Sequence, residues 1–303
     1  MAELQLSEYD RRAILAIHAW KHPKLTWFDR AMTVINAPLE WGGDLAMKIP
    51  GVEWVIEKSF GGILKLLNDG AAATVRPTAI FAEFQPPVLT LEDIANRDLE
   101  HVDRAIGFLS AKYASIALVE GTVAGGSTTL LGPEAAVAAI PADVVALLGM
   151  TLRAVGEYAT YTGFDIVKQE ERLFALNVLG LASAPTDAAK VVAMAQLVRI
   201  AKDVALKRTW KQLNEHAFVQ VVQVIAKALA IRLTKAKLGE VLPVAGAVIG
   251  GGFNAYFASR VCESAYFLYR ERFLARKYGA AVIEETVKAA PSGDYGKGYV
   301  AAT

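Results

Sequence analysis

The stretch from Leu242 to Lys277 constrains the fold more than any other part of this 303-residue chain. It starts as an apolar run spaced by glycines and continues without a break into a long helical pattern, and no charged residue occurs from Val241 to Ser259. A second segment, from Val119 to Tyr161, has the same build. Both segments are too apolar for an ordinary surface helix, so each must be buried in protein or touch a membrane.

Each segment contains two glycines separated by about one helical turn: Gly121 and Gly125 in the first, Gly246 and Gly250 in the second. Small residues at this spacing allow two helix backbones to approach closely, in membranes and also in tightly packed soluble cores. We therefore predict that these are helix-packing glycines. Gly246 and Gly250 should face the helix that contains Val119 to Gly125.

Three environments remain open for these segments: a buried soluble core, a surface that associates with a membrane or inserts conditionally, and a permanent membrane span. A spanning helix needs about 20 apolar residues, and Pro243 falls inside the later segment. The earlier segment carries Glu120, Glu134 and Asp143. A carboxylate at the centre of a bilayer costs about 2.5–3.5 kcal/mol, which favours the first two environments.

Helical periodicity is widespread, and the chain lacks the alternating pattern and hairpin turns that mark strands. We predict an all-α fold: a single multi-helix bundle with two glycine-rich apolar central helical segments. One helical domain should cover residues 1–288, followed by a disordered tail over 289–303. Helices are predicted over 7–20, 26–37, 44–68 with interruptions at Pro50-Gly51 and Gly61-Gly62, 90–119, 141–161, 169–182, 187–207, 210–237 and 253–278, and a packed loop over 76–87.

Composition narrows the possible partners and the compartment. The net charge of +1 gives no reason to expect binding to nucleic acid. Cys262 is the single cysteine, so no internal disulfide can form. The N-terminus is polar and acidic, without the basic start and apolar core of a signal peptide. We expect a cytoplasmic protein.

Polar residues within the apolar helices are the candidates for ligand binding. Asp143, Glu157 and Tyr161 share one face of the first segment. The second segment offers Asn254, Arg260 and Glu263. These residues form either a polar groove between the two central helices or a set of satisfied ion pairs in a closed core, because structural networks gather the same residue types.

Recognisable catalytic and metal-binding motifs are missing from the chain. There is no nucleophile elbow and no phosphate-binding loop of the Walker type. His18 and His22 have the spacing of helical zinc ligands, but the glutamate of that motif is missing and Pro23 follows at once. The G-x-G-x-x-A pattern from Gly250 lies too close to the C-terminus to begin a dinucleotide-binding sheet. We expect no metal and no cofactor, and the missing motifs favour a protein that is not an enzyme without deciding the question.

Three blocks of residues, spread over positions 20 to 279, together resemble the bacterial EcsC family. They are Trp20-Lys-x-Pro23 with Ile49-Pro50; Glu120-Gly, Gly125-Gly126, Gly132, Ile140-Pro-Ala-Asp143, Tyr161-x-Gly-Phe-Asp165 and Glu170-Glu-Arg172; and Leu242-Pro-x-x-Gly246-x-x-x-Gly250, Asn254, Arg270-x-Arg272-x-Leu274 and Lys277-Tyr-Gly279. The name-giving member is encoded beside the two components of an ABC transporter. The resemblance therefore implies an accessory role at a membrane but no defined reaction.

Two functions follow as expectations. The first is a non-enzymatic cytoplasmic protein that lies peripherally at the inner membrane and binds either the membrane surface or a membrane protein, such as a transporter. The second is a small-molecule or lipid-binding protein, or a hydrolase, that uses the polar groove between the two central helices.

Overall fold

The computed structural model describes residues 6–22, 52–68, 74–129, 133–182 and 245–290. Within these ranges the chain is helical and contains no strand, which confirms the predicted all-α class. The predicted helices over 26–37, 187–207 and 210–237, and the tail after residue 290, lie outside the described residues.

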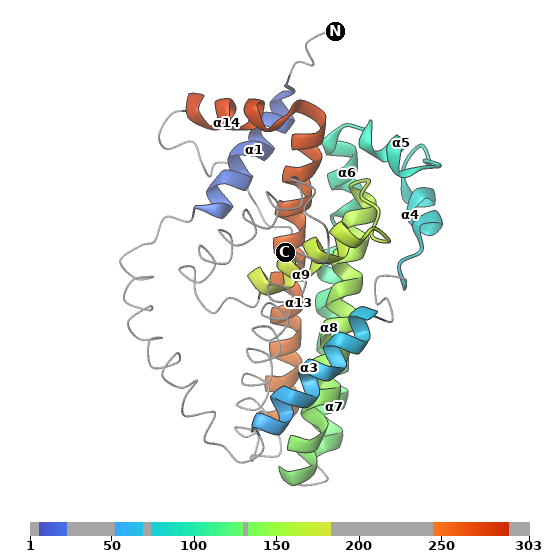
Figure 1. The fold of residues 1–303 in the computed structure, drawn as a ribbon, viewed down its shortest axis with the longest axis vertical. Coiled ribbons are helices and arrows are strands. Elements are labelled where there is room, and N and C mark those ends of the chain that lie inside the picture. Colours follow the sequence, from blue (N-terminus) through green and yellow to red (C-terminus); the bar gives the residue numbers. More distant parts are fainter. Residues whose placement is uncertain (1–5, 23–51, 69–73, 130–132, 183–244, 291–303) are drawn as a thin grey trace.

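Three long helices form the centre of the molecule: α7 (Leu109–Thr129), α8 (Pro133–Tyr161) and α13 (Ala245–Tyr278). They run side by side along the longest axis, with α7 antiparallel to both of the others (Figure 1). The most extensive contact between any two described helices is that of α7 with α13. The later glycine-rich segment thus lies in α13, and the earlier one is divided between the end of α7 and α8.

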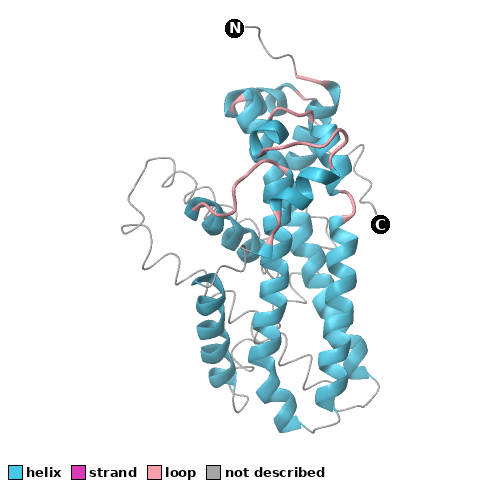
Figure 2. Ribbon diagram, turned by 90° about the vertical axis from the view of Figure 1, so that its right-hand side faces the viewer, coloured by secondary structure: helices cyan, strands magenta, loops and turns pink. Residues whose placement is uncertain are grey.

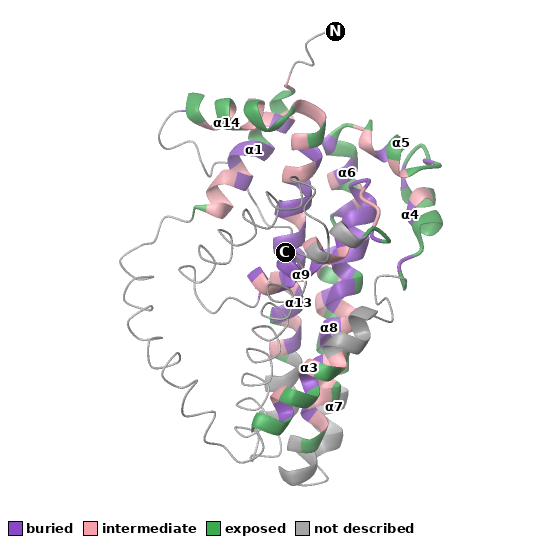
Figure 3. Ribbon diagram, viewed as in Figure 1, coloured by how far each residue is buried: buried purple, intermediate pink, exposed green. Residues whose placement is uncertain are grey.

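The α8 helix is central because it has apolar side chains on opposite faces. Val144, Leu148 and Val155 are buried on one side, and Ala154 and Tyr161 on another. In Figure 3 the buried residues concentrate on α8 and on the C-terminal half of α13. α3 (Val52–Asn68) crosses α8, as Figures 1 and 2 show.

α7 buries a narrow seam, formed by Tyr113, Ala117 and Gly121 at intervals of four residues. The residues between these three point away from the seam, so much of α7 remains exposed, including Ile116 and Val119. Ala117 and Gly121 are small, and small residues allow a neighbouring helix to approach closely. Gly121 is thus a buried residue of a packed helix, while the side-chain surroundings of Gly125, Gly246 and Gly250 lie outside the described part.

Shorter helices gather around the end of the bundle at which α8 and α13 finish. They are α1 (Glu8–Lys21), α4 (Pro77–Glu83), α5 (Leu91–Ala95), α6 (Leu99–Ile106), α9 (Gln169–Ala182) and α14 (Ala280–Ala289). α1 lies against α13 and α14 (Figure 1). Ser7 caps α1 by accepting a hydrogen bond from the Asp10 amide at 3.0 Å. Thr90 and Asp93 form a capping box at the start of α5.

Several predicted boundaries are wrong. The single helix expected over 90–119 is three helices, because Asp98 adopts the extended conformation of an N-cap and α6 ends at Gly107. The helix expected from Pro141 begins at Pro133, so Pro141 lies inside α8. A mid-helix proline loses one hydrogen bond, but the alanine-rich run before it favours the helix enough to continue through.

Other differences concern glycine and proline as helix breakers. α3 runs through Gly61-Gly62 without interruption, and α13 begins at Ala245, inside the glycine run rather than after it. The segment expected as a loop over 76–87 contains α4, which has Pro77 at its first turn. α14 was not predicted. α3 and α13 continue through their glycines because each glycine weakens a helix by only about 1 kcal/mol.

Candidate functional site

Glu157 on α8 is the centre of a polar cluster that joins α7 to α8. Its carboxylate pairs with Lys112 at 2.7 Å and with Arg153 at 3.5 Å. The glutamate is buried, whereas both cations reach solvent. A buried carboxylate with two cationic partners is satisfied, so Glu157 has no need of a bound ligand to offset its charge.

Two other groups near Glu157 could in principle carry chemistry, the hydroxyl of Tyr113 and the thiol of Cys262. Burial raises the pKa of the Cys262 thiol to about 12. Burial and the neighbouring Glu157 carboxylate also raise the pKa of Tyr113. A nucleophilic cysteine needs a lowered pKa and some exposure. Cys262 is therefore a small core residue, in agreement with its apolar sequence context.

The remaining predicted site residues are spread over two helices. Tyr161 donates a hydrogen bond to Glu83, the last residue of α4. Arg260 pairs with Glu263 on α13 at 3.3 Å. Among the described side chains, no hydrogen bond or ion pair joins Arg260 or Glu263 to Glu157 or Tyr161.

Asp143 and Asn254 are the two remaining residues of the predicted set. Asp143 is half-buried, about four turns before Glu157 along α8. Asn254 on α13 is buried, and its side-chain oxygen has no hydrogen-bond partner. The structure thus brings members of the predicted set together in two separate pairs: Arg260 with Glu263 on α13, and Glu157 near Tyr161 on α8.

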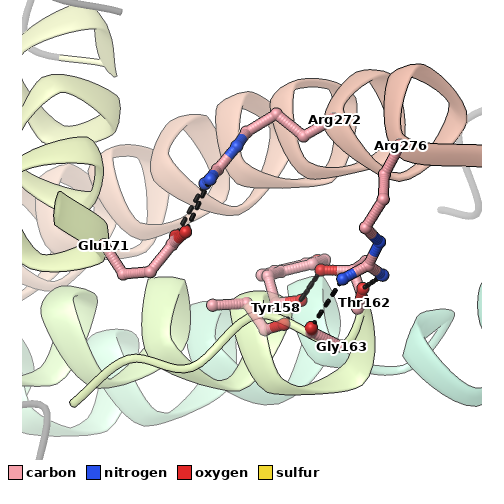
Figure 4. A network of polar contacts seen from close by, with 7 residues as sticks. Tyr158, Thr162, Gly163, Glu171, Arg272 and Arg276 are labelled. Carbon is pink, nitrogen blue, oxygen red and sulfur yellow. Dashed lines mark hydrogen bonds and ion pairs between the residues drawn. The ribbon is translucent and has the colours of Figure 1, made fainter. Parts of the chain in front are cut away.

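Arginines on α13 hold the turn that follows α8 (Figure 4). Arg276 donates hydrogen bonds to the carbonyl oxygens of Thr162 and Gly163, both at 2.8 Å. Arg272 forms a bidentate pair with Glu171 on α9, at 2.6 and 2.5 Å. Because a guanidinium presents several donors in a fixed plane, these two side chains fix both α8 and α9 against α13.

The turn itself is a glycine C-cap. Gly163 has a φ of +76°, and the amide of Phe164 donates to the carbonyl of Ala159 at 2.8 Å, as in a Schellman motif. The Phe164 ring lies under both guanidinium groups, 4.1 Å from Arg272 and 4.5 Å from Arg276. Cation–π contacts of this kind add to the Arg272–Glu171 ion pair and to the hydrogen bonds of Arg276.

A second network joins α1, α6 and α13. Asp103 on α6 accepts hydrogen bonds from Tyr9 and from Arg270, both at 2.6 Å. Asp10 on α1 accepts one from Tyr278 at 2.6 Å. Burial raises the pKa of Asp103 even with Arg270 beside it. Every one of these side chains serves a contact between helices.

Sequence reasoning missed these networks because their partners lie far apart along the chain. Arg272 and Glu171 are 101 residues apart, and Arg270 and Asp103 are 167 apart. The ion pairs Arg153–Glu157 and Arg260–Glu263 do have local spacing, and both form. Within the described ranges no group of three or more His, Cys, Asp or Glu side chains is placed to hold a metal ion.

These contacts define a class of protein: an all-α bundle whose long central helices are joined by buried ion pairs, hydrogen bonds and arginine–aromatic stacking. The chain belongs to the EcsC protein family, whose pattern matches residues 11–274. It is also similar to the uncharacterized protein YdbA of Bacillus subtilis (strain 168), with 28% identity over 185 residues. That match covers 60% of this chain and 62% of YdbA, so the chain spans less than two thirds of that relative. No solved structure matches the chain significantly.

Residues from the three blocks of the EcsC resemblance come together in the fold. Gly163 and Glu171 of the second block contact Arg276 and Arg272, at the end of α13 where the third block lies. Trp20 of the first block stacks on Phe267 of α13, with ring centroids 4.8 Å apart. Their contacts show a structural reason for these residues, independent of any reaction.

Proposed function

We propose that this protein is a non-enzymatic helical protein that binds a membrane surface. The observation that carries the proposal is a set of exposed apolar side chains on the two glycine-rich helices, hereafter the apolar surface: Ile116, Leu118 and Val119 on α7 and Tyr256 on α13. Val119 and Tyr256 are 62% and 61% exposed. Apolar side chains exposed together on a protein surface often mark a site of protein or membrane contact.

The helix register places these residues at a similar height along the bundle. Tyr113 on α7 interacts electrostatically with Cys262 on α13. Both helices rise by about 1.5 Å per residue, so counting in opposite directions from this pair brings Val119 to about the level of Tyr256. The apolar residues of the two helices then lie at one height, towards the glycine-rich ends.

The α8 helix adds support of a weaker kind. Its stretch Ala138–Tyr161 is long and apolar enough to cross a membrane; an 18-residue part of it has a mean hydropathy of 1.6, and 44% of that part is buried in the protein. It also carries Glu157 with its two cationic partners. These features favour association with a membrane surface over a permanent span.

The alternative is a small-molecule or lipid site in a groove between the central helices, with or without hydrolase activity. Its support is weaker, because Glu157, Tyr161, Arg260 and Glu263 each have a partner within the fold. Native mass spectrometry of the purified protein would favour this alternative if it detected a stoichiometric bound lipid or metabolite.

Flotation with liposomes tests the proposal. We expect the wild-type protein to float with vesicles, and the double variant Leu118→Asp/Val119→Asp to remain in the dense fraction, because two carboxylates on the apolar surface oppose burial in the interface. Leu89→Asp is the matched control, since Leu89 is 84% exposed but lies between α4 and α5. A wild-type protein that ignores vesicles would disprove membrane-surface binding. It would leave a membrane protein as the partner to seek.

A further inference from the structure

Two cationic side chains border the apolar surface. Lys112 lies one turn before Ile116 on α7, and Arg153 lies beside it on α8, since both contact Glu157. The side chains of Lys112 and Arg153 are 35% and 48% exposed, and that of Glu157 is 7% exposed. Two positive charges therefore face solvent over one buried negative charge, so the outward face of this cluster is positive.

The two helices carry these cations at the same height. On α7, the exposed face continues from Lys112 through Ile116 to Val119. On α8, which runs in the opposite direction, it continues from Arg153 back to Ala146 and Ala142. Apolar and small side chains thus lie on one side of both cations, towards the glycine-rich end.

This order is the one found in proteins that lie in a membrane interface. There, apolar side chains enter the boundary of the acyl chains, while lysine and arginine extend to the headgroups. Positive charges near an anionic leaflet each strengthen binding. A neutral membrane offers these cations no such gain.

We propose that the apolar surface binds membranes that contain anionic phospholipid, with Lys112 and Arg153 contacting the headgroup phosphates. The inference rests on the proposed membrane association and names the lipid class that it selects. Glu120, exposed on α7 one turn beyond Ile116, is the acidic residue nearest to the apolar surface on that helix. Its charge opposes the attraction, so its removal has the opposite effect to the removal of a cation.

Binding of the full chain to two kinds of vesicle tests this inference: phosphatidylcholine alone, and phosphatidylcholine mixed with phosphatidylglycerol. We expect tighter binding to the mixed vesicles, and an affinity for them that falls as salt is raised. Lys112→Gln and Arg153→Gln should each weaken that affinity roughly five-fold, and Glu120→Gln should strengthen it by a similar factor. None of the three should change binding to phosphatidylcholine alone.

Arg104→Gln is the matched control, because Arg104 is an exposed arginine in a similar helical pair, with Glu100 on α6. It should bind both vesicles like wild type. Lys112→Gln removes one partner of a buried carboxylate, so thermal denaturation must show that the variant is folded. Arg153 is more exposed than Lys112. If Lys112→Gln is unstable, the affinity of Arg153→Gln for the mixed vesicles tests the inference by itself.

The outcomes separate the two proposals. Equal binding to both vesicles, or an unchanged affinity in Arg153→Gln, would overturn the selection of anionic lipid and leave membrane association standing. Failure to bind either vesicle would overturn the membrane proposal itself, and the lipid inference with it.

Discussion

Gly163 shows how a single residue fixes the junction between three helices. Its φ of +76° is a conformation that L side chains rarely adopt, and its carbonyl accepts from Arg276. A Cβ atom at this position would lie 2.7 Å from the carbonyl oxygen of Leu91 and 2.9 Å from the Arg276 guanidinium. The space and the backbone conformation therefore both require glycine here.

Substitution of Gly163 tests whether this junction matters for stability. Gly163→Ala should lower the free energy of unfolding by at least about 3 kcal/mol, since backbone strain and overpacking add. Gly279→Ala is the control, because Gly279 has a φ of +86° but open space around it; only the strain term of about 1–3 kcal/mol applies. Urea unfolding of both variants measures the difference. Equal losses would mean that the packing around Gly163 yields easily.

Local spacing predicts side-chain pairs within a helix but not between helices. Arg153–Glu157 and Arg260–Glu263 follow from intervals of four and three residues. Lys112 could not be identified in this way, because its partner Glu157 lies 45 residues away and on another helix. The predicted ligand-binding set therefore contained Arg260 with its partner Glu263, but not Lys112, which pairs with Glu157 from another helix.

At the scale of elements, the sequence predicts which segments are helical better than where they begin. α9 has the predicted bounds, and the Thr90 capping box does begin a helix. The prediction and the structure agree at these two helices because the local sequence pattern and the packing of the fold favour the same bounds. The start of α13 was missed because glycines weaken a helix by only about 1 kcal/mol each, and the contact with α7 offsets that cost.

The packing of α7 against α13 gives a prediction about the glycine face. Counting from the Tyr113–Cys262 level brings Gly250 to about the height of Gly125, and Gly246 to about the height of Thr129 at the end of α7. Gly246→Leu should therefore lower the thermal stability, because overpacking costs about 1–3 kcal/mol and the gain in helix propensity recovers only about 1 kcal/mol.

Gly252→Leu is the matched comparison for that variant. Gly252 lies in the same helix, is exposed, and has no atom within 4 Å of an added Cβ. It should be as stable as wild type or slightly more so. If Gly246→Leu also melts at the wild-type temperature, the glycine face is not a packing surface and becomes a candidate for membrane contact.

The whole molecule has two ends of different character. Around α1, α6, α9 and the end of α13, buried carboxylates and arginines join helices that are distant in sequence. Towards the glycine-rich end, exposed apolar side chains lie on α7 and α13. The first end is built for rigidity, and the second is the one on which we place the membrane contact.

The Asp103–Arg270 pair tests how the rigid end depends on charge. Arg270→Met should lower the free energy of unfolding by about 3–5 kcal/mol at pH 8, because it leaves the Asp103 carboxylate buried and without its cation. Burial raises the pKa of Asp103, and loss of Arg270 raises it further. The folded variant then binds a proton more tightly than the unfolded chain, so its stability increases as the pH falls through the raised pKa.

Urea unfolding should show that Arg270→Met loses less stability relative to wild type at pH 5 than at pH 8. It should show little difference between these pH values for Asp103→Asn/Arg270→Met, which has no carboxylate to titrate. A deficit in Arg270→Met that is the same at both pH values would show that the buried charge of Asp103 is not its cause.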